Sequence, residues 1–179
     1  MSNIGSSGKA SGGELEEKID LTPETDAKLE QSAGLAKSGQ VKEALAILAA
    51  LEKRCRVGND LSNLIRVCEA SLQYCYDAGD IELLLTTLNT LTTRRSQKTQ
   101  AVRALVLKAM PWCVVDQFTP LSVPEEEVPA RDKLVEALRD ITDGKIFLEG
   151  ELARLTRALA IIKVRRNWED VIYVHIQFT

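Results

Sequence analysis

The stretch SGQVKEALAILAAL, residues 38–51, is echoed forty residues later by AGDIELLLTTLNTL, residues 78–91. The aligned positions are Gly39 with Gly79, Val41 with Ile81, Leu45 with Leu85, Leu48 with Leu88 and Leu51 with Leu91. Apolar residues at three- and four-residue spacing share one face of a helix. The echo repeats packing residues and no chemical group. It therefore indicates helix pairs that stack side by side, each pair covering the apolar stripe of the next.

Working outward from this unit, the sequence predicts seven short helices. Thr22 before Pro23, and aspartates at positions 60 and 80, are typical helix starts, and the two aligned glycines are typical helix ends. The expected helices lie at about 22–38, 41–56, 61–77, 81–93, 96–115, 130–144 and 145–163, with Pro111 ending or kinking the fifth and a loop at 116–129. The predicted fold is all-α, an irregular α-solenoid of stacked antiparallel helix pairs similar to tetratricopeptide or HEAT repeats.

The expected inward stripes are apolar in the third, sixth and seventh helices. They comprise Leu61, Leu64, Ile65, Cys68, Leu72, Cys75, Leu134, Leu138, Ile141, Ile146, Leu152, Leu155, Leu159 and Ile162. The composition agrees with helices, since 45% of the 179 residues are hydrophobic and only 4% aromatic. Residues 1–21 are rich in Gly, Ser and acids and are expected to form a disordered tail.

The bulk properties restrict the partners and the compartment. A net charge of −3 offers no cationic field for nucleic acid or an anionic membrane surface. The first twenty residues lack a secretory signal, and no apolar run approaches the ~18 residues of a membrane span. We expect a soluble, intracellular protein whose partners are proteins, with no nucleic acid, membrane or small-molecule substrate.

No constellation of residues predicts catalysis. The four cysteines, Cys55, Cys68, Cys75 and Cys113, lack zinc or disulfide spacing and are interpreted as reduced core thiols. His175 is the single histidine, so no Ser-His-Asp or Cys-His site is expected within the helical repeats. Phosphate-binding glycine loops are absent from the sequence. We predict no enzyme activity, and we assign no catalytic, cofactor or metal residues and no cofactor.

Charged clusters offer weaker signals. Arg94, Arg95, Lys98 and Arg103 form one basic group, and Arg154, Arg157, Lys163, Arg165 and Arg166 form another. Either group has the charge to meet phosphate, but no aromatic platform is interleaved with it. A solvated face or a surface for an acidic protein partner is the favoured interpretation. Glu125, Glu126 and Glu127 are interpreted as solvated charge.

Three stretches resemble a known family. LAKSGQVKEALAILAALEKRCR, LTTRRSQKTQAV and ITDGKIFLEGELARLTRALAIIK, within residues 30–163, are similar to the N-terminal part of the 26S proteasome non-ATPase regulatory subunit 12 family. The most specific pieces are RRSQ at 94–97, QAV at 100–102 and GKIFLEGELARLT at 144–156. The resemblance implies a non-catalytic scaffold in the lid of the regulatory particle, in contact with other lid subunits, located in cytoplasm and nucleus and supporting ubiquitin-dependent degradation.

The family pattern stops at Lys163. Members of the family continue to a C-terminal PCI domain, whereas residues 164–179 here, VRRNWEDVIYVHIQFT, have a strand-like, β-branched pattern. We interpret them as an atypical tail of a truncated form without the PCI domain. Three alternatives stay open: a COP9 signalosome subunit of the same architecture, a free-standing helical-repeat adaptor that binds a peptide in its concave face, and a small enzyme using a cysteine thiolate or paired carboxylates.

Overall fold

The described part of the chain is almost entirely helical. The computed structural model describes residues 21–116 and 119–177, with side chains described as far as Asn167. Its elements in order are α1 Thr22–Lys37, α2 Val41–Val57, α3 Leu61–Asp77, α4 Ile81–Thr93, α5 Thr99–Ala109, η1 Met110–Trp112, β1 Val114–Val115, β2 Thr119–Pro120, η2 Glu125–Glu127, α6 Val128–Thr142, η3 Ile146–Leu148 and α7 Glu149–Gln177. The predicted seven α-helices are confirmed in these residues.

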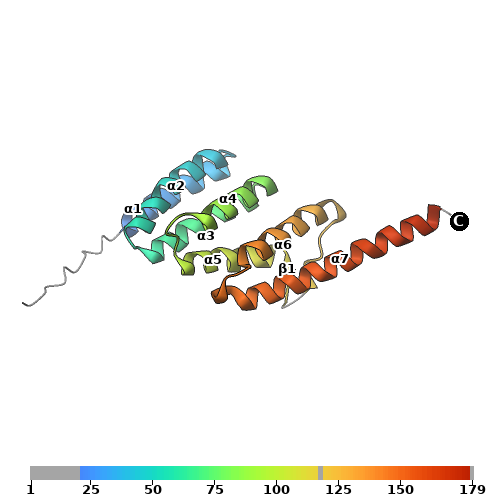
Figure 1. Ribbon diagram of the computed structural model, residues 1–179. Helices are drawn as coiled ribbons and strands as arrows, with labels where there is room; N and C mark the ends of the chain where they lie inside the picture. The colour runs from blue at the N-terminus through green and yellow to red at the C-terminus, as the bar shows by residue number, and fades with distance from the viewer. Residues whose placement is uncertain (1–20, 117–118, 178–179) are drawn as a thin grey trace, which may run out of the picture.

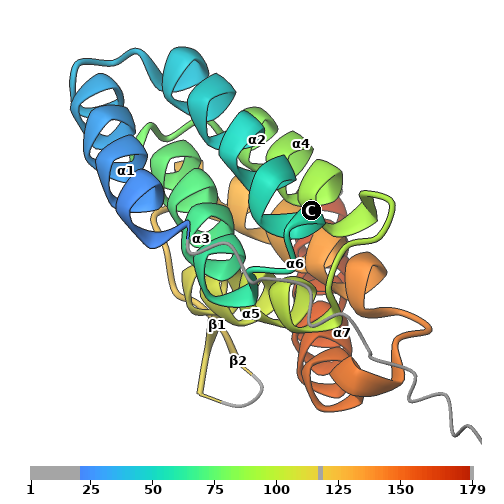
Figure 2. The same cartoon turned by 90° about the vertical axis from the view of Figure 1, so that its left-hand side faces the viewer.

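The helices stack side by side in chain order, as Figures 1 and 2 show. Consecutive helices pack as antiparallel pairs, and α3 lies at the centre, in contact with α1, α2, α4 and α5. Farther along, α4 contacts α6 and α6 contacts α7. The predicted helical-repeat solenoid agrees with this arrangement.

The forty-residue echo is a structural repeat. Gly39 and Gly79 both have positive φ, 82° and 68°, and each ends a turn between two helices. Leu48 and Leu88 are both fully buried, and residues 51 and 91 are nearly so. Asp80 caps α4 through the backbone N–H of Leu83 at 2.9 Å, as predicted from its position. The repeated residues therefore form the same turn and the same buried helix face in both units.

One continuous core runs through the stack. It includes Leu64, Leu72, Leu105, Leu138 and Leu155, all fully buried. Deep burial of such leucines contributes about 1.5–3 kcal/mol per side chain. Among the described helices, none combines the length and the apolar composition that crossing a membrane requires.

The middle of the chain is less regular than the sequence predicts. The fifth helix begins at Thr99 and ends at Ala109, where Pro111 falls in the 3-10 turn η1, so the predicted break at this proline is confirmed. The loop at 116–129 contains η2 and closes a two-stranded antiparallel pair of β1 with β2. The sixth helix begins earlier than expected, at Val128, with Pro129 in its first turn.

Two predictions about the seventh helix are wrong. Ile146 was expected on the inward stripe, but it lies in η3 and is 83% exposed, because the chain turns once before α7 begins. For residues 164–177 the strand-like interpretation also fails, since α7 is one helix that continues to Gln177 and extends past the other helices (Figure 1). Helical continuation outweighs the weak preference of β-branched residues for strands.

The N-terminal boundary shifts by one residue. Leu21, assigned to the tail from the sequence, is 6% exposed and belongs to the hydrophobic core. The predicted disordered tail otherwise falls on residues 1–20, which lie outside the described residues.

Candidate functional site

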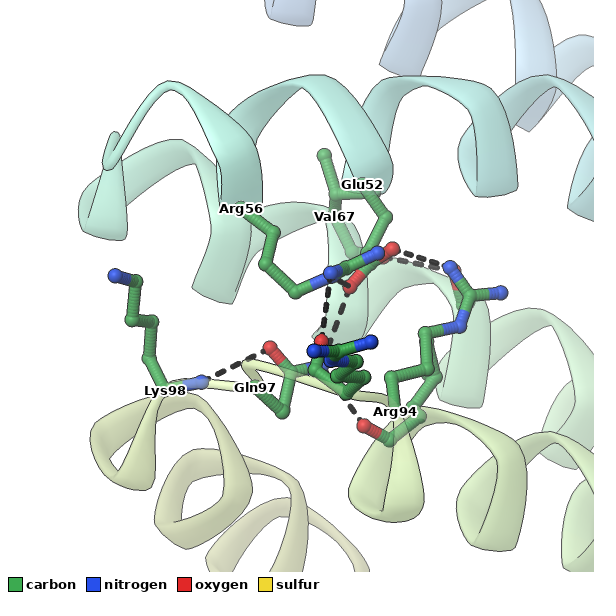
Figure 3. A network of polar contacts seen from close by, with 9 residues as sticks. Glu52, Arg56, Val67, Arg94, Gln97 and Lys98 are labelled. Carbon is green, nitrogen blue, oxygen red and sulfur yellow. Dashed lines mark hydrogen bonds and ion pairs between the residues drawn. The ribbon is translucent and has the colours of Figure 1, made fainter.

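The carboxylate of Glu52 on α2 is 1% exposed and accepts hydrogen bonds from three different side chains. Its Oε1 accepts hydrogen bonds from Arg56 Nε at 3.0 Å and from Gln97 Nε2 at 3.2 Å. Its Oε2 accepts from a guanidinium N–H of Arg94. Figure 3 shows these side chains converging from α2 and from the turn between α4 and α5. We call this group, Glu52 with its three donors, the Glu52 network.

The donors from positions 94–97 belong to the RRSQ stretch. This stretch leaves α4 at Arg94 and turns through Ser96, whose φ is +60°. Gln97 stabilises the turn from within, because its Nε2 also donates to the Leu91 carbonyl at 2.8 Å and its Oε1 accepts from the Lys98 backbone N–H at 3.1 Å. The RRSQ residues thus form a turn that packs onto the buried carboxylate of Glu52.

The network also reaches back from α2 to the turn. Nη1 of Arg56 donates to the carbonyl of Arg95 at 2.8 Å while its Nε holds Glu52. A buried carboxylate is strongly destabilising unless charges and hydrogen bonds compensate it, and here two guanidiniums and an amide do so. The arrangement fixes how α2, α4 and α5 lie relative to one another.

A second buried carboxylate repeats this construction. Asp132 on α6 is 1% exposed and accepts from Arg131 at 2.9 and 2.6 Å and from Arg166 of α7 at 2.7 Å. Arg131 also donates to the Leu121 carbonyl at 2.8 Å. Asp132 therefore holds α7 against α6, and Arg131 holds the preceding loop.

The basic clusters seen in the sequence are divided among structural contacts. In the first cluster Arg94 belongs to the Glu52 network, and Arg103 on α5 lies 3.5 Å from Glu151 of α7. In the second, Arg154 donates to the Asp116 carbonyl at 2.8 Å and Arg166 binds Asp132. These four arginines thus have four different partners. The acidic run at 125–127 forms the exposed turn η2.

The cysteine prediction is confirmed, since all four thiols are free and buried. Burial raises the pKa of Cys68 to about 12 and that of Cys113 to about 12. Burial likewise raises the pKa of Cys55 and Cys75, and for Cys75 a hydrogen bond from the thiol to the Thr87 hydroxyl partly offsets this rise. Protonated thiols are poor nucleophiles, so these cysteines act as core residues at neutral pH.

Metal and histidine chemistry find no geometric support in the described residues. Within that part of the chain no three His, Cys, Asp or Glu side chains come together as a metal site. His175 falls beyond the described side chains.

The sequence analysis did not identify Glu52 or Asp132. A signal existed for Glu52, because it lies four residues after Leu48 on the inward stripe, and its counterpart in the echo is Thr92, which is also buried. An acid on an apolar stripe predicts a buried partner. The identity of that partner, more than forty residues away in sequence, is set by the tertiary packing.

Known proteins match the part of the chain that contains the Glu52 network and the RRSQ turn. Residues 43–171 match the family model described as PSMD12/CSN4, N-terminal. The chain is 38% identical over 144 residues to 26S proteasome non-ATPase regulatory subunit 12 of Dictyostelium discoideum, covering 80% of this chain and 30% of that protein. It is 34% identical over 126 residues to homolog A of that subunit in Arabidopsis thaliana, covering 70% of this chain and 26% of the relative.

A fission-yeast relative extends the series. The 26S proteasome regulatory subunit rpn501 of Schizosaccharomyces pombe is 31% identical over 151 residues, covering 81% of this chain and 32% of its own length. The chain thus spans between a quarter and a third of the length of these relatives. The matched residues include the RRSQ turn, the Glu52 network and most of α7. The chain belongs to the PSMD12/CSN4 family, whose N-terminal model it matches over most of its length.

Proposed function

We propose that this chain is a non-catalytic scaffold of the lid of the 26S proteasome regulatory particle. It would pack against other lid and regulatory-particle subunits and so support ubiquitin-dependent protein degradation in cytoplasm and nucleus. The scaffold domain that we propose covers about residues 22–163, and the remainder of α7 prolongs it.

The observation that carries this proposal is that the two stretches that most resemble the family make contacts between helices. In the RRSQ stretch, Arg94 and Gln97 hold the buried carboxylate of Glu52. In GKIFLEGELARLT, the side chains of Leu148 and Leu155 are fully buried, and Glu151 pairs with Arg103 of α5. These residues hold helices against one another, and none of them is directed to a reaction centre. Residues that preserve the shape of a helical array favour a role in assembly.

Electrostatics and thiol chemistry also favour a scaffold over the enzyme alternative. A catalytic cysteine needs a lowered pKa and access to substrate, whereas burial raises the pKa of all four thiols. The buried carboxylates of Glu52 and Asp132 are each paired with two arginines, which leaves them unavailable as general bases.

Affinity purification tests the proposal. The chain, carrying an epitope tag, is expressed in cells of its source organism, and the eluate is quantified by mass spectrometry. We expect several regulatory-particle subunits to be enriched over a tag-only control. A Leu138→Asp variant, which places a charge in the fully buried core, should abolish that enrichment.

The alternatives give different eluates. COP9 signalosome subunits in place of proteasome subunits would assign the chain to that complex. An eluate without either set would overturn the scaffold proposal and favour a free-standing adaptor.

A further inference from the structure

A groove opens on the edge of the stack at the turn between α3 and α4. It has a volume of about 550 Å³ and is bordered by this turn, by η1 and by the start of α6 with the loop before it. Its apolar floor includes Ile81, Leu84, Leu121 and Leu134. This size lies within the range of binding clefts in proteins. We refer to it as the α3–α4 groove.

One wall of the groove is aromatic. The rings of Tyr76 and Trp112 stack with centroids 4.2 Å apart and an interplanar angle of 8°. Tyr76 is 43% exposed, among the larger exposed hydrophobic residues of the described surface. A stacked aromatic pair at a surface offers a rigid face to apolar groups and to cations.

The rim of the groove is acidic. Asp77, Asp80 and Glu127 contribute to its lining. Asp77 accepts a hydrogen bond from neutral Gln73 at 2.7 Å, and Asp80 accepts one from the Leu83 backbone N–H at 2.9 Å. Because both donors are uncharged, they do not neutralise the charge of Asp77 and Asp80. Among the described residues, these three carboxylates take part in no ion pair shorter than 4.0 Å.

The single cation among the described lining residues is already engaged. Arg131 binds Asp132 through two nitrogens, and its third bond goes to the Leu121 carbonyl at 2.8 Å. Its side chain is 9% exposed. The charge presented by the groove is therefore that of the three rim carboxylates. Such a site repels nucleotides, acidic peptides and anionic lipids, and it attracts cations.

We propose that the α3–α4 groove binds a cationic segment of a partner protein, in which Lys or Arg alternates with aliphatic residues. The aliphatic side chains occupy the apolar floor. A Lys or Arg lies against the Tyr76–Trp112 pair, with Asp77 and Glu127 within reach of its charge. This proposal concerns the chemistry of the partner and does not depend on which complex the chain enters.

Fluorescence titration tests it on the full chain. A Trp168→Phe background leaves Trp112 as the single tryptophan, because the sequence contains two. The probe is a twelve-residue peptide of alternating Leu and Lys, compared with Leu/Gln and Leu/Glu peptides of the same length. We expect the Leu/Lys peptide to change Trp112 emission with a dissociation constant of about 1–100 µM, weakening as salt rises from about 50 to about 300 mM.

A charge-matched pair of double variants separates the groove from general attraction. Asp77→Asn with Glu127→Gln neutralises the rim, while Glu30→Gln with Glu149→Gln removes two exposed acids elsewhere. Asp80 is left unchanged because it caps α4. We expect the rim variant to weaken Leu/Lys binding about tenfold and the control variant less than about twofold. Tyr76→Leu, which keeps an apolar wall, should weaken binding about threefold.

Several results would overturn the proposal. Equal weakening by both double variants would mean attraction to the overall charge. Equal affinity for the Leu/Gln peptide would mean an apolar site without selectivity for cations. No binding below about 1 mM, with circular dichroism unchanged, would mean that the groove is not a site. A dimer that Tyr76→Leu dissociates in sedimentation experiments would identify a second copy of the chain as the occupant.

Discussion

Replacing Glu52 by Gln tests the role of the buried carboxylate while leaving its volume almost unchanged. The hydrogen bonds from Arg56 and Arg94 lose their anionic acceptor, because an amide oxygen carries no formal charge, at a cost of about 1 kcal/mol each. The new amide N–H groups also face donors. The arginine side chains are only 15% and 25% exposed, so water compensates them incompletely. We expect the free energy of unfolding to fall by about 2–3 kcal/mol.

Urea unfolding followed by circular dichroism at the helical band measures this change. With a slope of about 2 kcal/mol/M, the midpoint should fall by about 1–1.5 M. Glu43→Gln, an exposed position on the same helix, serves as the matched control and should stay within about 0.5 kcal/mol. If Glu52→Gln changed stability no more than Glu43→Gln does, the network would not hold the α4–α5 turn.

A double-mutant cycle assigns the effect to the pair. Arg94→Met removes one guanidinium and keeps an apolar stem of similar length. The Glu52→Gln and Arg94→Met changes should show a coupling energy of about 1–3 kcal/mol, because they remove the same ion pair. Additive effects would contradict a direct interaction.

Three further predictions concern the repeat and its core. Leu88→Ala, at a fully buried position, should lower the free energy of unfolding by about 2–5 kcal/mol in urea titrations, and a loss under 1 kcal/mol would contradict its place in the core. Gly79→Ala should lower the free energy of unfolding by about 1 kcal/mol, because the φ of Gly79 is +68°. Gly34→Ala should raise it by about 0.5–1 kcal/mol, because Gly34 lies inside α1 and no atom is within 4 Å of the added methyl group. The opposite order of the two effects would refute the turn geometry. Burial raises the pKa of Cys68 and Cys113 to about 12, so the thiols of the unfolded chain lose their protons at lower pH than those of the folded chain. The free energy of unfolding should therefore be constant below about pH 8.5 and fall from there to pH 12, by up to about 1.4 kcal/mol per pH unit for each thiol. Cys68→Ala should reduce this slope in thermal unfolding measured against pH, and an unchanged slope would argue against the burial of Cys68.

The helices and their ends could be read from the sequence because the signals are local. Asp60 and Asp80 each accept a hydrogen bond from a backbone N–H three residues ahead, which depends on neighbours within one turn. Gly39 and Gly79 adopt the positive φ that the end of each helix requires. The period of the leucines also selects the buried face, since residues on one helical stripe must all meet the neighbouring helix.

Local sequence signals did not predict the secondary structure correctly where helix and strand were both compatible with the residues. The β-branched residues after Lys163 predict a strand in isolation, yet they continue α7, whose earlier turns are already anchored by Leu155 and Ile162. Extending an existing helix adds one hydrogen bond per residue without a new nucleation step. Ile146 shows the reverse case, because one 3-10 turn before α7 rotates an apolar side chain into solvent.

By itself the sequence determined the class of fold, the positions of most helices, the repeat of forty residues and the resemblance to the family. Only the tertiary structure decided which distant groups meet: Glu52 with Arg94 and Gln97, and Tyr76 with Trp112 in one wall of the groove. The physical reason is that a helix depends on contacts within four residues. A buried charge or an aromatic wall depends instead on the packing of whole helices, and no short stretch of sequence encodes that packing.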